Sequence, residues 1–170
     1  MVTLSFRFIN LVVMSTILFD AIRKGEDKKV KELLQEHPKW INEKDARGST
    51  PLLLACYYGL EDISKIIIEY NPNIDAQDAS GNTALMGVCF KGHTNIAKLL
   101  IDNGANVNVT NFNGATALIY AATFAKKDIV KLLLENGADT TIKDDRGNTA
   151  MDHAQMQEAQ PIIELLESKK

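Results

Sequence analysis

The stretch GNTALMGVCFKGHTNIAKLLIDNGANVN, residues 81–108, is one copy of a pattern that recurs every 33 residues along the chain. Each copy has a glycine followed two residues later by a threonine. These pairs are Gly48 and Thr50, Gly81 and Thr83, Gly114 and Thr116, and Gly147 and Thr149. Aliphatic residues repeat with the same step, as at Ile67, Leu100, Leu133 and Leu166. A fixed period of this length predicts a stack of small supersecondary units, each burying its apolar face against its neighbours.

Within each copy, the residues predict two short helices joined by tight turns. In the copy at 111–143, the Asn-Gly pair at 113–114 is a turn signal. Thr116 is suited to begin the first helix, because its hydroxyl can accept a bond from an unpaired backbone N–H. Residues 129–133 carry the i, i+3, i+4 apolar stripe of a second helix with one buried face. Helices this short are not stable alone, so we expect stacking to supply the core.

These copies resemble the ankyrin-repeat family, whose unit is a β-turn followed by two antiparallel helices. The resemblance is carried by STPLLLACYYG (49–59), by the stretch at 81–108 and by DIVKLLLENGAD (128–139). It implies an all-α fold: an ankyrin-repeat solenoid of stacked helix-turn-helix units joined by β-turn or hairpin loops. We place this domain at 16–170. The expected repeats, of which the first and last are degenerate caps, span about 16–44, 45–77, 78–110, 111–143 and 144–170.

Two departures from the family pattern carry structural predictions. The histidine of the family's T-P-L-H motif is replaced throughout, so the hydrogen bonds that it makes between loops should be absent or replaced. The replacing residues are Leu53, Met86, Ile119 and Asp152. Ala125 stands where Gly59 and Gly92 end the first helix of other repeats. A left-handed backbone at that position would add roughly 1 kcal/mol of strain to an alanine.

Composition and motifs argue against several classes of function. The formal net charge of −3 leaves no overall basic field to hold a nucleic acid. The sequence contains no catalytic motif, and its three histidines lie at non-equivalent positions. Cys56 and Cys89 hold equivalent positions in adjacent repeats, where stacked helices lie too far apart for a disulfide. We expect both to be small buried core residues, in a protein that is not an enzyme and needs no cofactor or metal.

The resemblance also indicates where a partner would bind. Ankyrin proteins usually meet partners on the concave face, which the turns and the outer side of each first helix form. By register, the predicted partner-binding residues are Arg23, Lys24, Arg47, Tyr57, Tyr58, Phe90, Lys91, Phe112, Phe124, Arg146 and Met156. Exposed aromatic residues beside Arg and Met are typical of interface hot spots. The alternative is that some of these rings tuck between repeats and only cover the core.

We therefore expect a monomeric, non-catalytic interaction module that binds another protein on a rigid concave face. Two alternatives stay open: an exported or membrane-tethered accessory or stress-protective scaffold, and an enzyme inhibitor that acts by docking. Residues 1–15, MVTLSFRFINLVVMS, bear on this choice because they are strongly apolar. They are either an extension that packs on the first repeat or a secretory signal or membrane anchor. The first interpretation predicts a cytoplasmic protein, and the second a periplasmic or secreted one.

Overall fold

Pairs of short helices follow one another along the chain in the computed structural model, which describes residues 16–168. The first pair is formed by helical residues 16–23 and α2 (Asp27–Glu36), and the 3-10 helix η1 (Pro38–Asn42) follows it. The later pairs are α3 (Pro51–Tyr57) with α4 (Glu61–Ile68), α5 (Ala84–Lys91) with α6 (Thr94–Asp102), α7 (Ala117–Thr123) with α8 (Lys127–Glu135), and α9 (Ala150–Met156) with α10 (Gln160–Glu167). No β-strand occurs within residues 16–168. The predicted all-α fold is confirmed.

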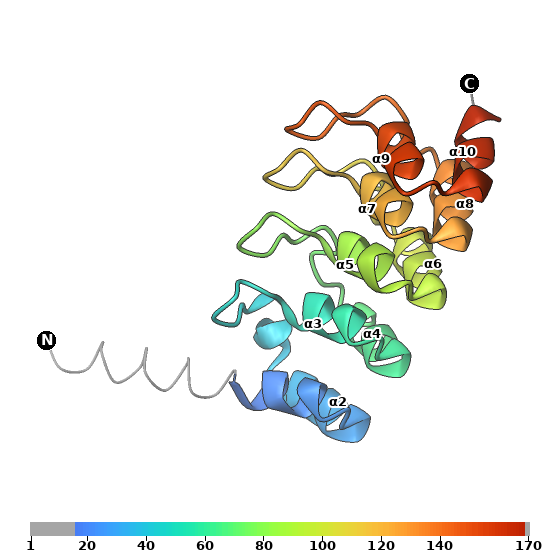
Figure 1. Cartoon of the computed structure of the whole chain (residues 1–170). Coiled ribbons are helices and arrows are strands. Elements are labelled where there is room, and N and C mark those ends of the chain that lie inside the picture. The colour runs from blue at the N-terminus through green and yellow to red at the C-terminus, as the bar shows by residue number, and fades with distance from the viewer. Residues whose placement is uncertain (1–15, 169–170) are drawn as a thin grey trace, which may run out of the picture.

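The pairs stack into two columns, and the turns between pairs project from one side of the stack (Figure 1). The inner column contains α3, α5, α7 and α9, each in contact with the next. The outer column contains α2, α4, α6, α8 and α10, which also contact one another in succession. Each pair therefore covers the apolar face of its neighbour, as the predicted solenoid requires.

The inner helices from α3 onward begin at the threonines that the sequence predicts. In each, the threonine hydroxyl accepts a 3.3 Å hydrogen bond from the backbone N–H three residues later. The four bonds join Leu53 to Thr50, Met86 to Thr83, Ile119 to Thr116 and Asp152 to Thr149. In α9, the last inner helix, the Asp152 carboxylate also accepts a bond from the Thr149 backbone N–H, which completes a capping box. These bonds satisfy backbone donors that a helix start leaves unpaired.

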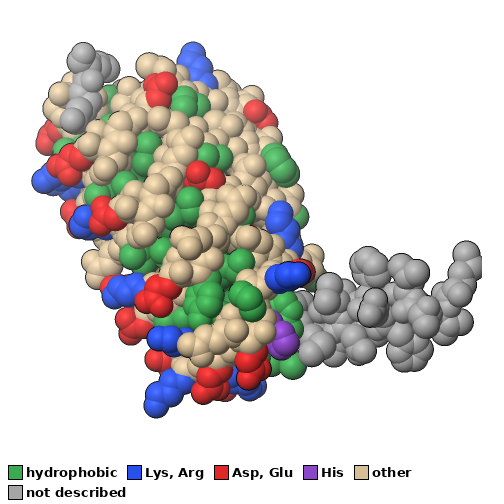
Figure 2. All heavy atoms as spheres, turned by 180° about the vertical axis from the view of Figure 1, so that it is seen from behind, with side chains coloured by type: hydrophobic (Ala, Val, Ile, Leu, Met, Phe, Trp, Pro, Cys, Tyr) green, Lys and Arg blue, Asp and Glu red, His purple; other side chains and the backbone are tan. Residues whose placement is uncertain are grey.

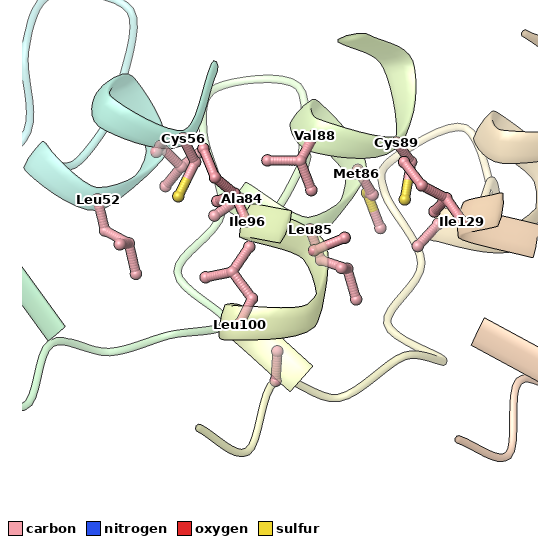
Figure 3. Packing of buried hydrophobic residues seen from close by; sticks show 14 of the residues in the cluster. Leu52, Cys56, Ala84, Leu85, Met86, Val88, Cys89, Ile96, Leu100 and Ile129 are labelled. Atoms are coloured by element: carbon pink, nitrogen blue, oxygen red, sulfur yellow. The ribbon is translucent and has the colours of Figure 1, made fainter. Parts of the chain in front are cut away.

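Apolar side chains of both columns meet in a continuous core between them (Figure 3). Leu85 of α5 and Leu100 of α6 both point into it and are fully buried. Cys56 and Cys89 lie at matching places in α3 and α5, buried and not bridged, as predicted. Burial raises the pKa of the Cys56 thiol to about 12, against a small opposing effect of its hydrogen bond with Ser64. Burial also raises the pKa of Cys89 far above its ordinary value.

A left-handed residue ends each of the later inner helices and turns the chain into its outer partner. The backbone angle φ is +73° at Gly59 and +90° at Gly92, where glycine adopts it without strain. At Ala125 and Glu158 φ is 52°, in the same left-handed region. The strain expected at Ala125 is therefore present, and Glu158 adds a second strained position in the last pair.

Two sets of predictions are not decided by this fold. The interpretations of residues 1–15 as a packing extension, a signal or an anchor concern residues outside the described range. The repeat boundaries also remain predictions, although each pair from α3 onward falls inside one expected repeat. Among the described helices, none has the length and apolar character needed to cross a membrane.

Candidate binding groove

The projecting turns are held in a fixed shape by one side chain each. In every turn, the Oδ1 atom of an Asp or Asn accepts 2.8–3.0 Å bonds from the N–H groups two and four residues later. These residues are Asp45, Asp78, Asn111 and Asp144. Backbone bonds then join successive turns: Ala79 N donates to Arg47 O at 3.3 Å, and Phe112 N donates to Ser80 O at 3.2 Å. The turns therefore form one connected row.

Polar side chains replace the missing histidines as links between turns and helices. Tyr120 of α7 donates its hydroxyl to Asn82 Oδ1 at 3.1 Å, and Asn111 Nδ2 donates to the same atom at 2.9 Å. Partial burial raises the pKa of Tyr120, so its hydroxyl stays a donor. In the last turn, His153 Nε2 lies 2.8 Å from Asp144 Oδ2. Burial opposes ionisation of Asp144, but backbone N–H bonds and His153 together hold its pKa below the ordinary value.

A groove of about 730 Å³ lies between this row of turns and the inner helices α3 and α5. Gly87 of α5 belongs to its lining, whereas Leu54 and Tyr120 occupy the equivalent positions one repeat before and after. Outside the backbone of its own helix, a Cβ atom added to Gly87 would meet the Cδ2 atom of Tyr57 at 3.9 Å and nothing closer. The absent side chain at Gly87 therefore leaves open space in the groove.

A row of aromatic rings crosses the inner helices beside this open space. Tyr57 and Phe90 lie nearly parallel with centroids 6.5 Å apart, and Phe90 meets Phe124 edge to face at 4.6 Å. Tyr57 also meets Tyr58 edge to face at 5.7 Å. The Lys91 ammonium lies 4.4 Å from the Tyr57 centroid and 5.4 Å from that of Phe90, in cation–π contact with both. We call Tyr57, Tyr58, Phe90 and Phe124 the aromatic row.

The aromatic row combines mutual packing with exposure. The exposed fractions are 42% for Tyr57, 52% for Tyr58 and 40% for Phe124. The ring contacts join α3, α5 and α7, so the rings support one another across repeats without being covered. The sequence left two alternatives open, exposed hot-spot rings or rings that tuck between repeats. The structure has features of both, because the rings pack between repeats and much of their surface still faces outward.

Family models for repeat proteins match most of this chain. A model of ankyrin repeats in three copies matches residues 18–111, which is more than half of the sequence, and a model of ankyrin repeats in many copies matches residues 100–154. The chain belongs to the ankyrin-repeat family. Ankyrin repeats generally mediate protein–protein interaction, and proteins of this kind are generally non-catalytic. A comparison with curated proteins found no match.

The structure brings most of the predicted partner-binding residues to the groove or to its bordering rings. Arg23, Arg47, Tyr57, Tyr58 and Phe90 line the groove, and Lys91 and Phe124 contact its rings. Arg23 is also tied down, because its guanidinium binds Asp20 and Asp45 at 3.1 Å each.

The other predicted residues lie elsewhere. Phe112 is 68% exposed and lines a separate hollow of about 520 Å³ beside Lys44 and Gln77. Lys24, Arg146 and Met156 are exposed but do not line the groove. The register placed all of these residues on turns or helix ends, yet it did not say which ends share one hollow.

Sequence reasoning missed several residues of the groove, chiefly Gly87, Met86 and Tyr120. A signal for two of them exists in the repeat register, since Gly87 and Tyr120 hold the same position as Leu54 in successive ankyrin repeats. A glycine between two large side chains at equivalent helix positions predicts a hollow. Across residues 16–168, no group of three or more His, Cys, Asp or Glu side chains could hold a metal ion.

Proposed function

We propose that this protein is a monomeric, non-catalytic module that binds a partner protein in the groove, with the aromatic row as its anchor. The observation that carries the proposal is a set of rings fixed by contacts with one another, of which Tyr57, Tyr58 and Phe124 are 40–52% exposed and Phe90 is half-buried between them. Large, rigid rings lose little conformational entropy on binding, and both Tyr and Phe are enriched at protein interfaces.

The rigidity of the turns supports the same proposal. Asx bonds within turns and backbone bonds between them fix the groove wall before any partner arrives. A preformed surface avoids the ordering cost that a flexible loop incurs on binding. A modest contact area can therefore give a specific complex.

The outer helices offer a weaker candidate surface. Their exposed side chains form ion pairs along single helices, such as Lys65 with Glu61 at 2.7 Å and Lys98 with Asp102 at 2.8 Å. Seen from behind, charged side chains of both signs alternate down the edge at the left, on the side of the outer column (Figure 2). Alternating, screened surface charges of this kind are typical of a solvated face.

A paired pull-down from host lysate, read by mass spectrometry, tests the proposal. One bait is the wild-type protein, and the second carries Tyr57→Ala, Phe90→Ala and Phe124→Ala. The matched control carries Lys65→Ala, Lys98→Ala and Lys131→Ala on the outer helices. Circular dichroism and a urea midpoint check that each bait is folded. We expect a partner that the wild type and the control capture and the aromatic variant loses. Equal capture by all three baits would reject the groove as the binding site.

A further inference from the structure

The acidic groups in the groove are already used by the protein itself. Asp45 Oδ1 accepts the N–H groups of Arg47 and Ser49, and its Oδ2 binds the guanidinium of Arg23 at 3.1 Å. Asp78 Oδ1 likewise accepts two backbone N–H groups, and its Oδ2 accepts the Asn82 amide at 3.4 Å. Both carboxylates therefore have both oxygens engaged. Asp45 is neutralised by Arg23, whereas Asp78 keeps its charge because its donors are neutral.

Two cations at the same groove have no such partner. Within residues 16–168, neither Arg47 nor Lys91 takes part in an ion pair. Arg47 lies at a turn tip, and Lys91 rests against the faces of Tyr57 and Phe90. Arg23, Arg47 and Lys91 therefore exceed Asp45 and Asp78 by one positive charge at the groove, although the chain as a whole has a net charge of −3.

The open space at Gly87 supplies an apolar pocket close to Lys91. Leu53, Leu54 and Met86 line the same groove, and each is at most 8% exposed. Gly87 and Lys91 are four residues apart in α5, so they lie one turn apart on the same helix face. Neighbours at this spacing are about 5–6 Å apart. Alternate side chains of an extended peptide are separated by about 6.6 Å, which is nearly the same distance.

We propose that the groove binds a short acidic segment of the partner in an extended conformation. One bulky apolar side chain sits over Gly87, and a carboxylate two residues away in sequence binds Lys91. Arg47, on the turn wall of the groove, adds to the attraction for the acidic segment. This inference rests on the proposed function and adds the chemistry of the partner. Rings around Lys91 exclude water from one side of the ammonium, which strengthens its attraction for a carboxylate. A basic segment is repelled by the same two cations.

The test is a selection of random octapeptides displayed on phage, with the full-length protein as the target. We expect the enriched peptides to share Asp or Glu two positions from Leu, Ile, Phe or Trp. Fluorescence anisotropy of one enriched peptide then compares variants. Gly87→Leu fills the space and should weaken binding by at least tenfold, with Gly87→Ala intermediate. Arg47→Glu combined with Lys91→Glu should weaken it by about tenfold or more, and added salt should weaken wild-type binding.

A control variant with the same change in net charge tests whether the loss of affinity depends on charges at the groove or on the net charge of the protein. Lys28→Glu combined with Lys127→Glu alters exposed residues of the outer helices α2 and α8 and should leave the affinity unchanged. Circular dichroism establishes that every variant compared is folded.

The remaining outcomes separate this inference from the proposed function. If the enriched peptides lack acidic residues but still bind the Gly87→Leu variant more weakly, the acidic character of the segment is refuted. Binding in the groove would then still stand. If the enriched peptides bind the Gly87→Leu variant as tightly as the wild type, the inference that a short segment sits at Gly87 is wrong. It is also wrong if no peptide is enriched. Failure of the proposed function shows separately, as capture of the partner by the aromatic variant in the pull-down.

Discussion

The residue that ends each inner helix gives a quantitative test of how the backbone is strained. Gly92 and Ala125 occupy equivalent positions with left-handed φ angles of 90° and 52°. The substitutions Ala125→Gly and Gly92→Ala make the same chemical change in opposite directions at the same place in the fold. Ala125 is exposed, so removing its methyl group loses little packing.

The expected magnitude follows from two opposing effects. A left-handed conformation costs an L-residue about 1–2 kcal/mol, which glycine avoids. Glycine also gives the unfolded chain more conformational freedom than alanine does, and this lowers the free energy of unfolding by about 0.4–1 kcal/mol. Ala125→Gly should therefore raise the free energy of unfolding by about 0.5–1 kcal/mol. Gly92→Ala should lower it by a similar amount, because its new Cβ would lie 3.2 Å from the flexible end of the Lys126 side chain, which can move aside.

Urea unfolding followed by far-ultraviolet circular dichroism measures both changes. With a denaturant slope of about 2 kcal/mol/M, the midpoint should shift by about 0.25–0.5 M, upward for Ala125→Gly and downward for Gly92→Ala. In an ordinary helix interior, alanine to glycine instead costs about 1 kcal/mol. A loss of that size for Ala125→Gly would refute the reasoning from backbone conformation.

Three further predictions follow from single contacts. Gly87→Ala should raise stability by about 0.5–1 kcal/mol in thermal melts, because Gly87 is inside α5 and its Cβ has room; a lower melting temperature would contradict this. Thr116→Val should cost about 1 kcal/mol in urea by removing the bond from Ile119 N, and an unchanged midpoint would deny the cap a role. Native Cys56 and Cys89 should resist Ellman's reagent at pH 8 and react in urea. Since folding raises the pKa of Cys56 to about 12, the stability it contributes is complete below the ordinary thiol pKa and is lost as pH rises from there toward 12. Rapid labelling of the native protein would show that these thiols are not buried.

The fold could be predicted from the sequence because equivalent positions of each repeat carry residues with the same structural role. Thr116 caps its helix and Cys89 is buried, as the 33-residue register predicts. The left-handed Ala125 was also predictable, since its two counterparts in earlier repeats are glycines. Repetition makes such inferences strong, because one position can be compared with its equivalents inside the same chain.

The groove could be predicted only in part. The register identified Tyr57 and Phe90 as surface residues, but it carries no information about which side chains meet across repeats. Phe112 shows the limit: it shares the exposure of the other rings, yet the path of its turn directs it to a different hollow. The pairing of Asp45 with Arg23 joins residues 22 positions apart and has no counterpart in the repeat pattern. Such contacts depend on the three-dimensional path of the turns.

Hydrogen exchange of the protein with and without its captured partner tests the central claim most directly. The account predicts slower exchange on binding in α3, α5 and the turns at 45–49 and 78–82, which surround the groove. Fast-exchanging amides of the outer helices α4, α6 and α8 should change little. Protection confined to those outer helices, with the groove amides exchanging as in the free protein, would contradict the account.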